Sequence, residues 1–299
     1  MRQSLIDLID KTILYKYELL PNSEVRPRTI FSTLNDRCYS AESIDDVVSI
    51  IYNSIIDYSY NEFDISDNDL STLHFRALQN KIRYDESDSD LTQLKYGFFG
   101  EVLLYSVLLV LFKVKPLIAR GYFYDPLSNS ETKGYDAYHL IENDGKTELW
   151  FGEVKFHKSY TTAVKSALEN VKKAISDNYL ESNVFALQNQ KNNLNISGSQ
   201  IGQIIDNWQR SSTIKLIDEI KKNDMTLVYP VMLLYDKETF DYDVSIAKVP
   251  KHIKEKYTVP DFPISIQYQI FFILLPLDEV TKIKKEVLSW IESRKPLIS

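Results

Sequence analysis

Two acidic residues and a lysine fall on two short runs that the sequence predicts to be paired β-strands. Asp136 lies within the run 133–140, and Glu153 and Lys155 lie near the end of the run 148–156. Carboxylates are the hard oxygen ligands that Mg²⁺ and Mn²⁺ prefer, and an adjacent lysine can orient a nucleophilic water or offset charge in a transition state. These residue types therefore indicate metal-assisted hydrolysis of a phosphodiester.

The register of the two runs decides whether these side chains meet. Asp144-Gly145 stands between the runs and is the strongest short-range signal for a hairpin. With a two-residue loop, Asp136 faces Glu153 with Cβ atoms roughly 4.5 to 5.5 Å apart, and Lys155 points to the same face. A four-residue loop keeps this register, whereas a three-residue loop places Asp136 and Glu153 on opposite faces.

The Glu-x-Lys pattern alone is a weak signal. A second copy, Glu219-Ile220-Lys221, lies in a predicted helix, where residues i and i+2 do not face each other. The simpler explanation for Asp136 and Glu153 is a solvated pair on an exposed strand. Facing like charges destabilise a hairpin, however, which favours a site that holds a cation or a proton.

A further carboxylate precedes the hairpin. Glu101 lies in a helix predicted over 91–112, directly before an almost wholly apolar segment, where an unpaired carboxylate would be costly. Glu101 therefore either caps and solvates the helix start or serves the site. The apolar segment is far shorter than the ~20 residues of a membrane span, so a buried helix is expected.

Basic residues follow the hairpin. Lys158, Lys165 and Lys172 lie on or just before a helix predicted over 162–179. With Lys155 they would form a basic strip suited to the phosphates of nucleic acid, although a solvated helix face explains the same charges. The four histidines show no metal-ligand spacing, and His157 alone lies close enough in sequence to contact a phosphate.

Composition indicates a globular protein. The 299 residues are 44% hydrophobic and 26% charged, with a net charge of -7, which excludes a histone-like coat of positive charge but not a local basic groove. The single cysteine, Cys38, excludes an internal disulfide and a cysteine-based metal cluster, and fits a reducing compartment. No signal peptide is evident at the N-terminus. A soluble, cytoplasmic protein with no membrane association is expected.

The chain divides into two predicted parts. Residues 1–90 form an α-rich region with amphipathic helices expected near 4–17 and 42–60, and are a possible docking region for a partner. Residues 91–299 hold the candidate site. Two continuous aliphatic runs, 226–235 and 266–275, predict strands that are covered on both faces, and a closing helix is expected over 278–294.

Together these features resemble a known group of enzymes. Gly100-Glu101 on a helix, then Asp136, then Glu153-Val154-Lys155 on a strand followed by a helix, is similar to the PD-(D/E)xK nuclease superfamily. The runs 134–140 and 149–156 resemble more specifically the HamA family, the nuclease subunit of the Hachiman anti-phage defence system. The resemblance covers residues 91–299.

The resemblance implies a fold and a set of roles. The fold would be α/β, with a restriction-endonuclease-like core of a mixed central sheet flanked by helices. Asp136 and Glu153 would be metal ligands for Mg²⁺ or Mn²⁺, Lys155 the catalytic lysine, and Glu101 a supporting carboxylate and metal ligand. Tyr135 stands where the superfamily often has proline.

The same resemblance implies partners. The protein would degrade DNA as a defence effector and would be held in check by a helicase subunit, HamB. Two alternatives remain from the sequence. The chain can be a non-catalytic subunit that binds a helicase, or a restriction-type endonuclease outside the Hachiman system.

Overall fold

A seven-stranded mixed sheet forms the centre of the computed structural model, which describes residues 1–65, 68–125, 130–131, 134–143, 146–190, 193, 202–203, 206 and 215–298. The strand order is β1-β2-β9-β8-β7-β6-β3, and a separate pair joins β4 and β5. The strands of the large sheet are β1 (Ile13–Leu19), β2 (Asp36–Ala41), β3 (Lys115–Pro116), β6 (Ala137–Asn143), β7 (Lys146–Phe156), β8 (Thr226–Asp236) and β9 (Gln267–Leu277); β4 is Tyr124–Asp125 and β5 is Ser130–Glu131.

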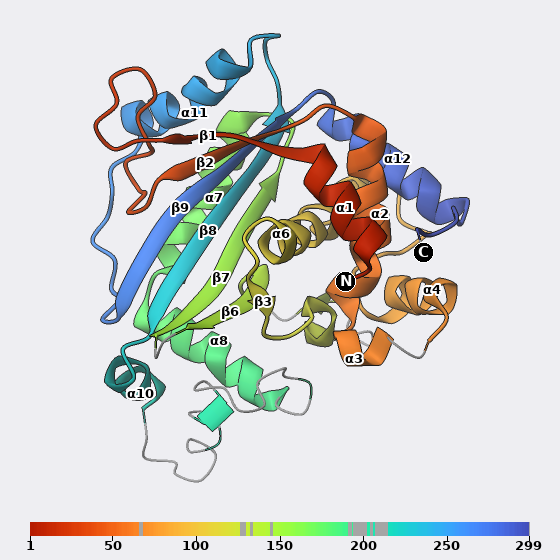
Figure 1. Cartoon of the computed structure of the whole chain (residues 1–299), viewed down its shortest axis with the longest axis horizontal. Helices are drawn as coiled ribbons and strands as arrows, with labels where there is room; N and C mark the ends of the chain where they lie inside the picture. The colour runs from red at the N-terminus through yellow and green to blue at the C-terminus, as the bar shows by residue number, and fades with distance from the viewer. Residues whose placement is uncertain are drawn as a thin grey trace.

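Helices cover both faces of this sheet (Figure 1). On one side lie α1 (Gln3–Thr12), α2 (Ile44–Ser59), α6 (Phe98–Val110) and α12 (Val280–Glu292); on the other lie α7 (Tyr160–Ala174), α8 (Asp177–Asn189) and α11 (Tyr242–Lys256). The remaining helices are α3 (Glu62–Ile65), α4 (Leu70–Asn80), α5 (Asp90–Gln93), the 3₁₀ turn η1 (Arg120–Phe123) and α10 (Leu216–Lys222). The expected α/β class, a mixed sheet flanked by helices, is confirmed.

The central strands are buried on both sides, as their aliphatic runs predicted. Strands β7, β8 and β9 run parallel, whereas β6 runs antiparallel to β7. Because side chains alternate along a strand, Val228 and Met232 of β8 enter the core beneath α6, while Leu227 and Val231 enter the core beneath α7. Full burial of each such side chain contributes about 1.5 to 3 kcal/mol.

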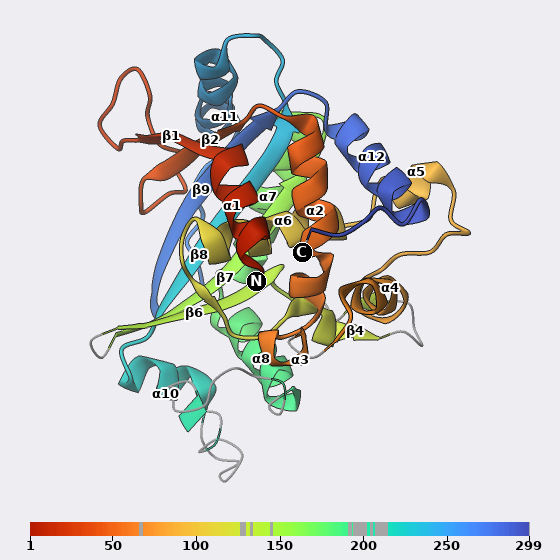
Figure 2. The same cartoon turned by 45° about the vertical axis from the view of Figure 1, so that its right-hand side comes forward.

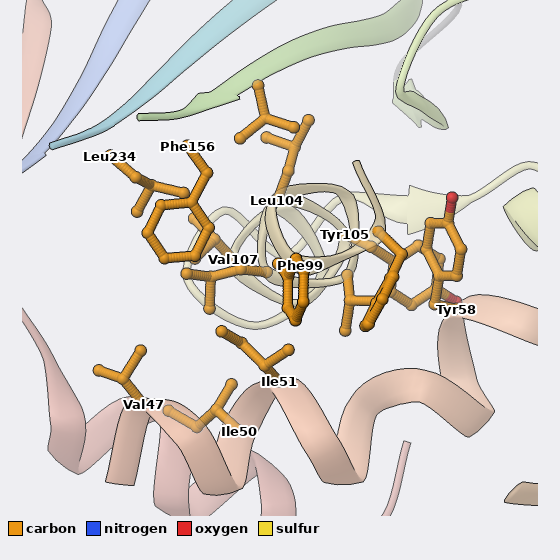
Figure 3. Packing of buried hydrophobic residues seen from close by; sticks show 14 of the residues in the cluster. Val47, Ile50, Ile51, Tyr58, Phe99, Leu104, Tyr105, Val107, Phe156 and Leu234 are labelled. Atoms are coloured by element: carbon orange, nitrogen blue, oxygen red, sulfur yellow. The ribbon is translucent and has the colours of Figure 1, made fainter. Parts of the chain in front are cut away.

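Helix α6 lies between the sheet and α2 and is apolar on nearly all sides. Figure 3 shows Ile50 and Ile51 of α2 below α6, and Phe156 of the sheet beside it. The helix approaches the sheet closely at Gly100, where an added Cβ would lie 3.1 Å from a methyl group of Val154. This close contact fixes the position of the next residue, Glu101.

The single helix expected over 91–112 is wrong in its extent. Helix α5 ends at Gln93 and α6 begins at Phe98. Gly97 precedes α6 directly, and an added Cβ there would lie 2.7 Å from Oε1 of Glu101. Within the described residues, Asp90–Val110 is the one helical stretch that is apolar and long enough to span a membrane, and it is mostly buried inside the protein. Most of this stretch is α6, which lies in the core; a soluble, cytoplasmic protein stays a prediction.

The N-terminal residues share the sheet and the core with the rest of the chain. The helix expected over 4–17 ends at Thr12, and the next seven residues form β1 instead. Strand β2 pairs with β1 and, in parallel, with β9. Asp36 in β2 accepts hydrogen bonds from the main-chain N–H of Thr29 at 2.6 Å and of Phe272 at 2.8 Å. The boundary at residue 90 and a docking role for residues 1–90 stay predictions.

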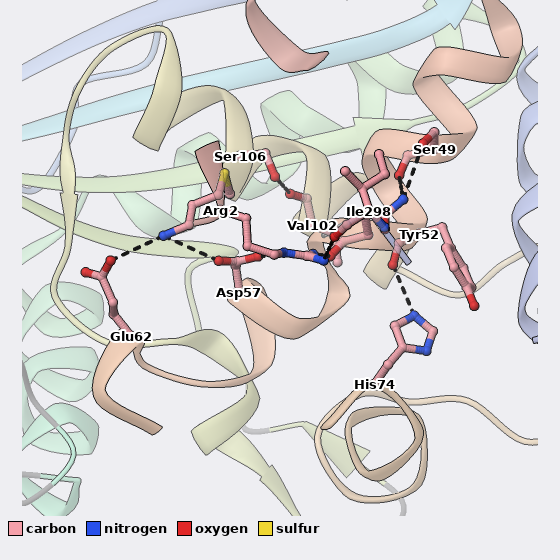
Figure 4. A network of polar contacts seen from close by, with 11 residues as sticks. Arg2, Ser49, Tyr52, Asp57, Glu62, His74, Val102, Ser106 and Ile298 are labelled. Carbon is pink, nitrogen blue, oxygen red and sulfur yellow. Dashed lines mark hydrogen bonds and ion pairs between the residues drawn. The ribbon is translucent and has the colours of Figure 1, made fainter. Parts of the chain in front are cut away.

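Polar contacts tie α2 to its surroundings. Arg2 donates to the carbonyl of Asn53 at 2.6 Å and lies 3.8 Å from the Asp57 carboxylate, and a ring nitrogen of His74 lies 3.1 Å from the carbonyl oxygen of Tyr52 (Figure 4). Helices α2, α4 and α12 lie close together on this side of the molecule (Figure 2). The helices expected near 42–60 and over 278–294 are present as α2 and α12. Each is one or two residues shorter at its ends than predicted.

The hairpin has the predicted register. Asn143 pairs with Lys146, and the ladder continues to Ala137 opposite Gly152. The turn residues Asp144 and Gly145 lie outside the described residues. The predicted register is nevertheless confirmed, because every pair from Asn143–Lys146 to Ala137–Gly152 has the predicted partners.

Candidate functional site

Strand β7 continues beyond its partner β6, and the candidate site lies at the edge thus left open. The ladder ends at Ala137, whereas β7 runs on to Phe156. Asp136 follows the ladder by one residue: its N–H donates to the carbonyl of Gly152 at 2.9 Å. Its Oδ2 accepts the N–H of Val154 at 2.8 Å. The Asp136 carboxylate therefore takes the place of a strand partner for β7. This hydrogen bond holds the Asp136 side chain next to Val154.

The Asp136 carboxylate is close enough to Glu153 to act on it electrostatically. Burial, with the nearby Asp136 carboxylate adding to it, raises the pKa of Glu153 to about 7. Burial also raises the pKa of Asp136, against the opposing effects of Lys155, the Val154 N–H and Arg120. The site thus keeps a buried pair of acids that a proton or a cation would stabilise.

Glu153 is held by three partners from three elements. It is 3% exposed. Its Oε1 accepts hydrogen bonds from the ammonium of Lys155, and from Nδ2 of Asn170 at 2.8 Å. The hydroxyl of Tyr229 on β8 donates to Oε2 at 3.3 Å. These contacts orient the carboxylate, since each arises from a buried or half-buried side chain with little freedom.

Lys155 stays charged within this cluster. Burial alone would lower its pKa, but the carboxylates of Asp136, Glu153 and Glu101 together raise it. Its ammonium is therefore a fixed positive charge beside the two acids. Such a charge can stabilise negative charge on a phosphate during reaction.

Glu101 reaches the same cleft from α6. The cleft has a volume of about 280 Å³, and Glu101, Asp136 and Lys155 line it. Glu101 is 9% exposed and accepts a hydrogen bond at Oε2 from the hydroxyl of Tyr58, a fully buried residue of α2. Glu101 is thus both a helix-start residue and a wall of the site, and α2 orients it.

The donor set fits a divalent cation with several water ligands. Oδ1 of Asp136 accepts no hydrogen bond from the residues that the structure describes, and it lies beside a second carboxylate, Glu153. Over those same residues, no three Asp, Glu, His or Cys side chains gather closely enough to hold a metal by themselves. Mg²⁺ is usually bound by one or two carboxylates and keeps its waters, so two carboxylates are enough.

Two of the predicted phosphate-binding lysines, Lys165 and Lys172, share one face of α7, but this face is turned away from Asn170. On α7, Asn170 marks the edge beside the site, and with 3.6 residues per turn Lys165 and Lys172 lie roughly 140° and 160° around the helix from it. Lys173, roughly 60° away, lies nearer that edge. All three lysines are exposed. Lys158, also exposed, follows β7 directly. Nucleic-acid binding by Lys158, Lys165 and Lys172 stays a prediction.

Several residues of the site gave no signal in the sequence. Tyr58, Asn170 and Tyr229 contact the carboxylates from positions far along the chain. Arg120 is buried, and its charge opposes the rise that burial causes in the pKa of Asp136. Asn170 alone had a detectable context, because it lies on a predicted helix directly after the strand that carries Glu153.

Fold and site together define the class of the protein: a mixed α/β protein in which a hairpin and a core helix bring carboxylates and a lysine to one cleft. The family model of HamA matches residues 6–291. The chain belongs to the HamA family, a component of the Hachiman anti-phage defence system, as the resemblance implied. Comparison with curated proteins and with solved structures finds no match.

We predict that the Asp136–Glu153 pair releases a proton near neutral pH. Burial lets folded Glu153 hold its proton to about pH 7, whereas the ordinary value is 4.5. Between these values the folded state binds more protons, so the free energy of unfolding falls as pH rises. Carboxyl ¹³C NMR should show a titration step near neutral pH. Loss of this step in Glu153→Gln would assign it to the Asp136–Glu153 pair. Titration of both acids below pH 5 would contradict the prediction.

We also predict that Tyr58→Phe weakens binding of Mn²⁺ about tenfold, because Glu101 loses the hydroxyl that orients it. Calorimetric titration of the folded protein measures this change. Tyr105→Phe is the matched control: Tyr105 is also buried on this side of the sheet, with its ring 6.2 Å from that of Tyr58. Equal Mn²⁺ affinity in wild type and Tyr58→Phe would show that the contact does not support the site.

Proposed function

We propose that the protein is a metal-dependent nuclease that hydrolyses DNA phosphodiester bonds. The observation that carries this proposal is the cluster of Asp136, Glu153 and Lys155 at the open edge of β7. Asp136 and Lys155 line a cleft there, and the buried Glu153 carboxylate accepts a hydrogen bond from the Lys155 ammonium. This combination of charges serves a phosphodiester better than a neutral substrate, because the reaction develops negative charge on the phosphate.

The proposed cofactor is Mg²⁺ or Mn²⁺, held by Asp136 and Glu153 and supported by Glu101. When bound, such an ion polarises the phosphate and lowers the pKa of a coordinated water. Membership of the HamA family supports this assignment, as does the resemblance of Asp136, Glu153 and Lys155 to the motif of PD-(D/E)xK nucleases.

The chain's own residues supply orientation and charge. Asn170 and Tyr229 hold Glu153 so that its carboxylate keeps one direction. The main chain of Val154 holds Asp136 in the same way. Lys155, which lines the cleft, offsets charge on the phosphate and can orient the attacking water through a hydrogen bond. Fixed geometry of this kind lowers the barrier because little reorganisation is needed during reaction.

We further propose that this nuclease is the effector of the Hachiman system and that a partner helicase, HamB, restrains it. The family supports the system and makes a restriction-type endonuclease outside it less favoured. The contact between Tyr58 and Glu101 offers a physical route for restraint, because a partner that shifted α2 would shift a wall of the site. A non-catalytic subunit that binds the helicase is the competing function.

We predict that Glu153→Gln and Lys155→Met each reduce Mg²⁺-dependent DNA cleavage by roughly 10²-fold or more. The first change removes a metal-binding charge, and the second removes the ammonium beside the phosphate. Cleavage of a labelled duplex, with and without EDTA, measures the loss.

The chain contains matched controls for these variants. Glu219 and Lys221 repeat the Glu-x-Lys pattern on α10, away from the site, so Glu219→Gln and Lys221→Met should cleave like wild type. Undiminished cleavage by folded Glu153→Gln and Lys155→Met would overturn the nuclease assignment. Defence against phage that survives both substitutions would favour the non-catalytic subunit.

A further inference from the structure

The cleft holds a buried cation that the proposed reaction does not use. Lys284 of α12 is 9% exposed and lines the cleft that Asp136 and Lys155 line. Its ammonium donates to the carbonyl of Phe156 at 2.9 Å and to the carbonyl of Leu94 at 3.1 Å. Both carbonyls are neutral groups, so neither balances the positive charge.

Lys284 has no acidic partner among the residues that the structure describes. It forms no salt bridge there, and burial lowers its pKa to about 8 with no carboxylate acting against the shift. Lysine is almost never this buried without a partner, because removing an ammonium from water is costly. The rings of Phe99 and Phe156, with centroids 5.5 and 5.0 Å from the ammonium, offset only part of that cost.

One donor of Lys284 remains for a ligand. An ammonium has three N–H groups, and two of them are taken by the carbonyls. The side chain borders the cleft, so the third can meet a group that enters it. Lys95 and His157 line the same cleft. Burial, with the charges of Lys284 and Lys155 adding to it, lowers the pKa of His157.

The cleft is therefore divided by charge. Glu101 and Asp136 contribute acids, while Lys284 and Lys95 contribute cations that form no salt bridge with the described residues. An acidic wall suits a divalent cation, and a basic wall suits an anion. A nucleic-acid strand presents several phosphates in a row and can occupy both.

We propose that the Lys284 ammonium binds a backbone phosphate of the DNA strand, next to the phosphate that is cleaved at Asp136, Glu153 and Lys155. This inference rests on the proposed nuclease function for the identity of the strand. Lys284 then acts on binding and not on the chemical step, so its loss raises KM and leaves kcat nearly unchanged.

Equilibrium binding of a fluorescent duplex in EDTA, where cleavage cannot occur, tests the site. In Lys284→Met the affinity should fall about tenfold or more, and the slope of log K against log salt should become shallower by about 0.9, the value for one lost phosphate contact. Lys285→Met is the control: it removes the same charge from the next, exposed residue of α12 and should keep the wild-type slope. If Lys284→Met does not fold, Lys284→Gln removes the charge and keeps donors for the carbonyls.

A neutral methylphosphonate at single positions of the duplex identifies the contact. One position should weaken binding to wild type and have no effect on Lys284→Met. If the loss instead requires a 5′-phosphate, the phosphate belongs to a strand end and the site still stands. An unchanged salt slope in both Lys284 variants overturns the inference.

The two proposals fail separately. A wild-type protein that cleaves DNA while Lys284→Met and Lys284→Gln bind with the wild-type slope keeps the nuclease function and loses the phosphate site. If Lys284→Met shows the shallower slope while the wild-type protein shows no Mg²⁺-dependent cleavage, the phosphate site stands and the nuclease function is lost.

Discussion

The open edge of β7 is the constraint on which the rest of the site depends. Beyond Gly152 the strand has no partner on the β6 side, yet its buried main-chain groups still need hydrogen bonds. Side chains supply them. The Asp136 carboxylate accepts a hydrogen bond from the N–H of Val154, and the Lys284 ammonium donates one to the carbonyl of Phe156. The need to satisfy the backbone thus places an acid and a cation at successive positions of the same edge.

Burial then gives these groups their chemistry. Helix α6 borders the cleft at Gly100, where it packs tightly against β7, and α7 borders the cleft at Ser166. Water is excluded from Glu153, so the acid pair is held at a high free energy that a cation can lower. The same burial makes Lys284 a receptor for an anion. The packing of the core and the electrostatics of the cleft therefore have one cause.

Sequence reasoning reached the parts of this arrangement that are local. The Asp144-Gly145 pair and alternating side chains predicted the hairpin register, and the aliphatic runs predicted β8 and β9. It did not reach β1, because Ile13 and Leu14 continue a helical spacing that in fact ends at Thr12. Helix α11 was also missed, and Pro250 in its interior argues against a helix on local grounds.

Contacts made across the fold stayed out of reach for a different reason. Tyr58, Tyr229 and Lys284 meet the site only because α2, β8 and α12 pack around α6 and β7, and no spacing within the sequence records such contacts. Lys165 and Lys172 show the converse. Their spacing does place them on one face of α7, but that face lies roughly opposite Asn170, and its binding of nucleic acid stays a prediction.

The central claim is that Asp136 and Glu153 form one metal site at the open edge of β7. A crystal structure of the protein soaked in Mn²⁺, measured for anomalous scattering, tests it most directly. The account predicts one strong anomalous peak between these two carboxylates, which disappears in Asp136→Asn. A well-ordered crystal with Mn²⁺ bound elsewhere, or with none at this pair under saturating Mn²⁺, would contradict it.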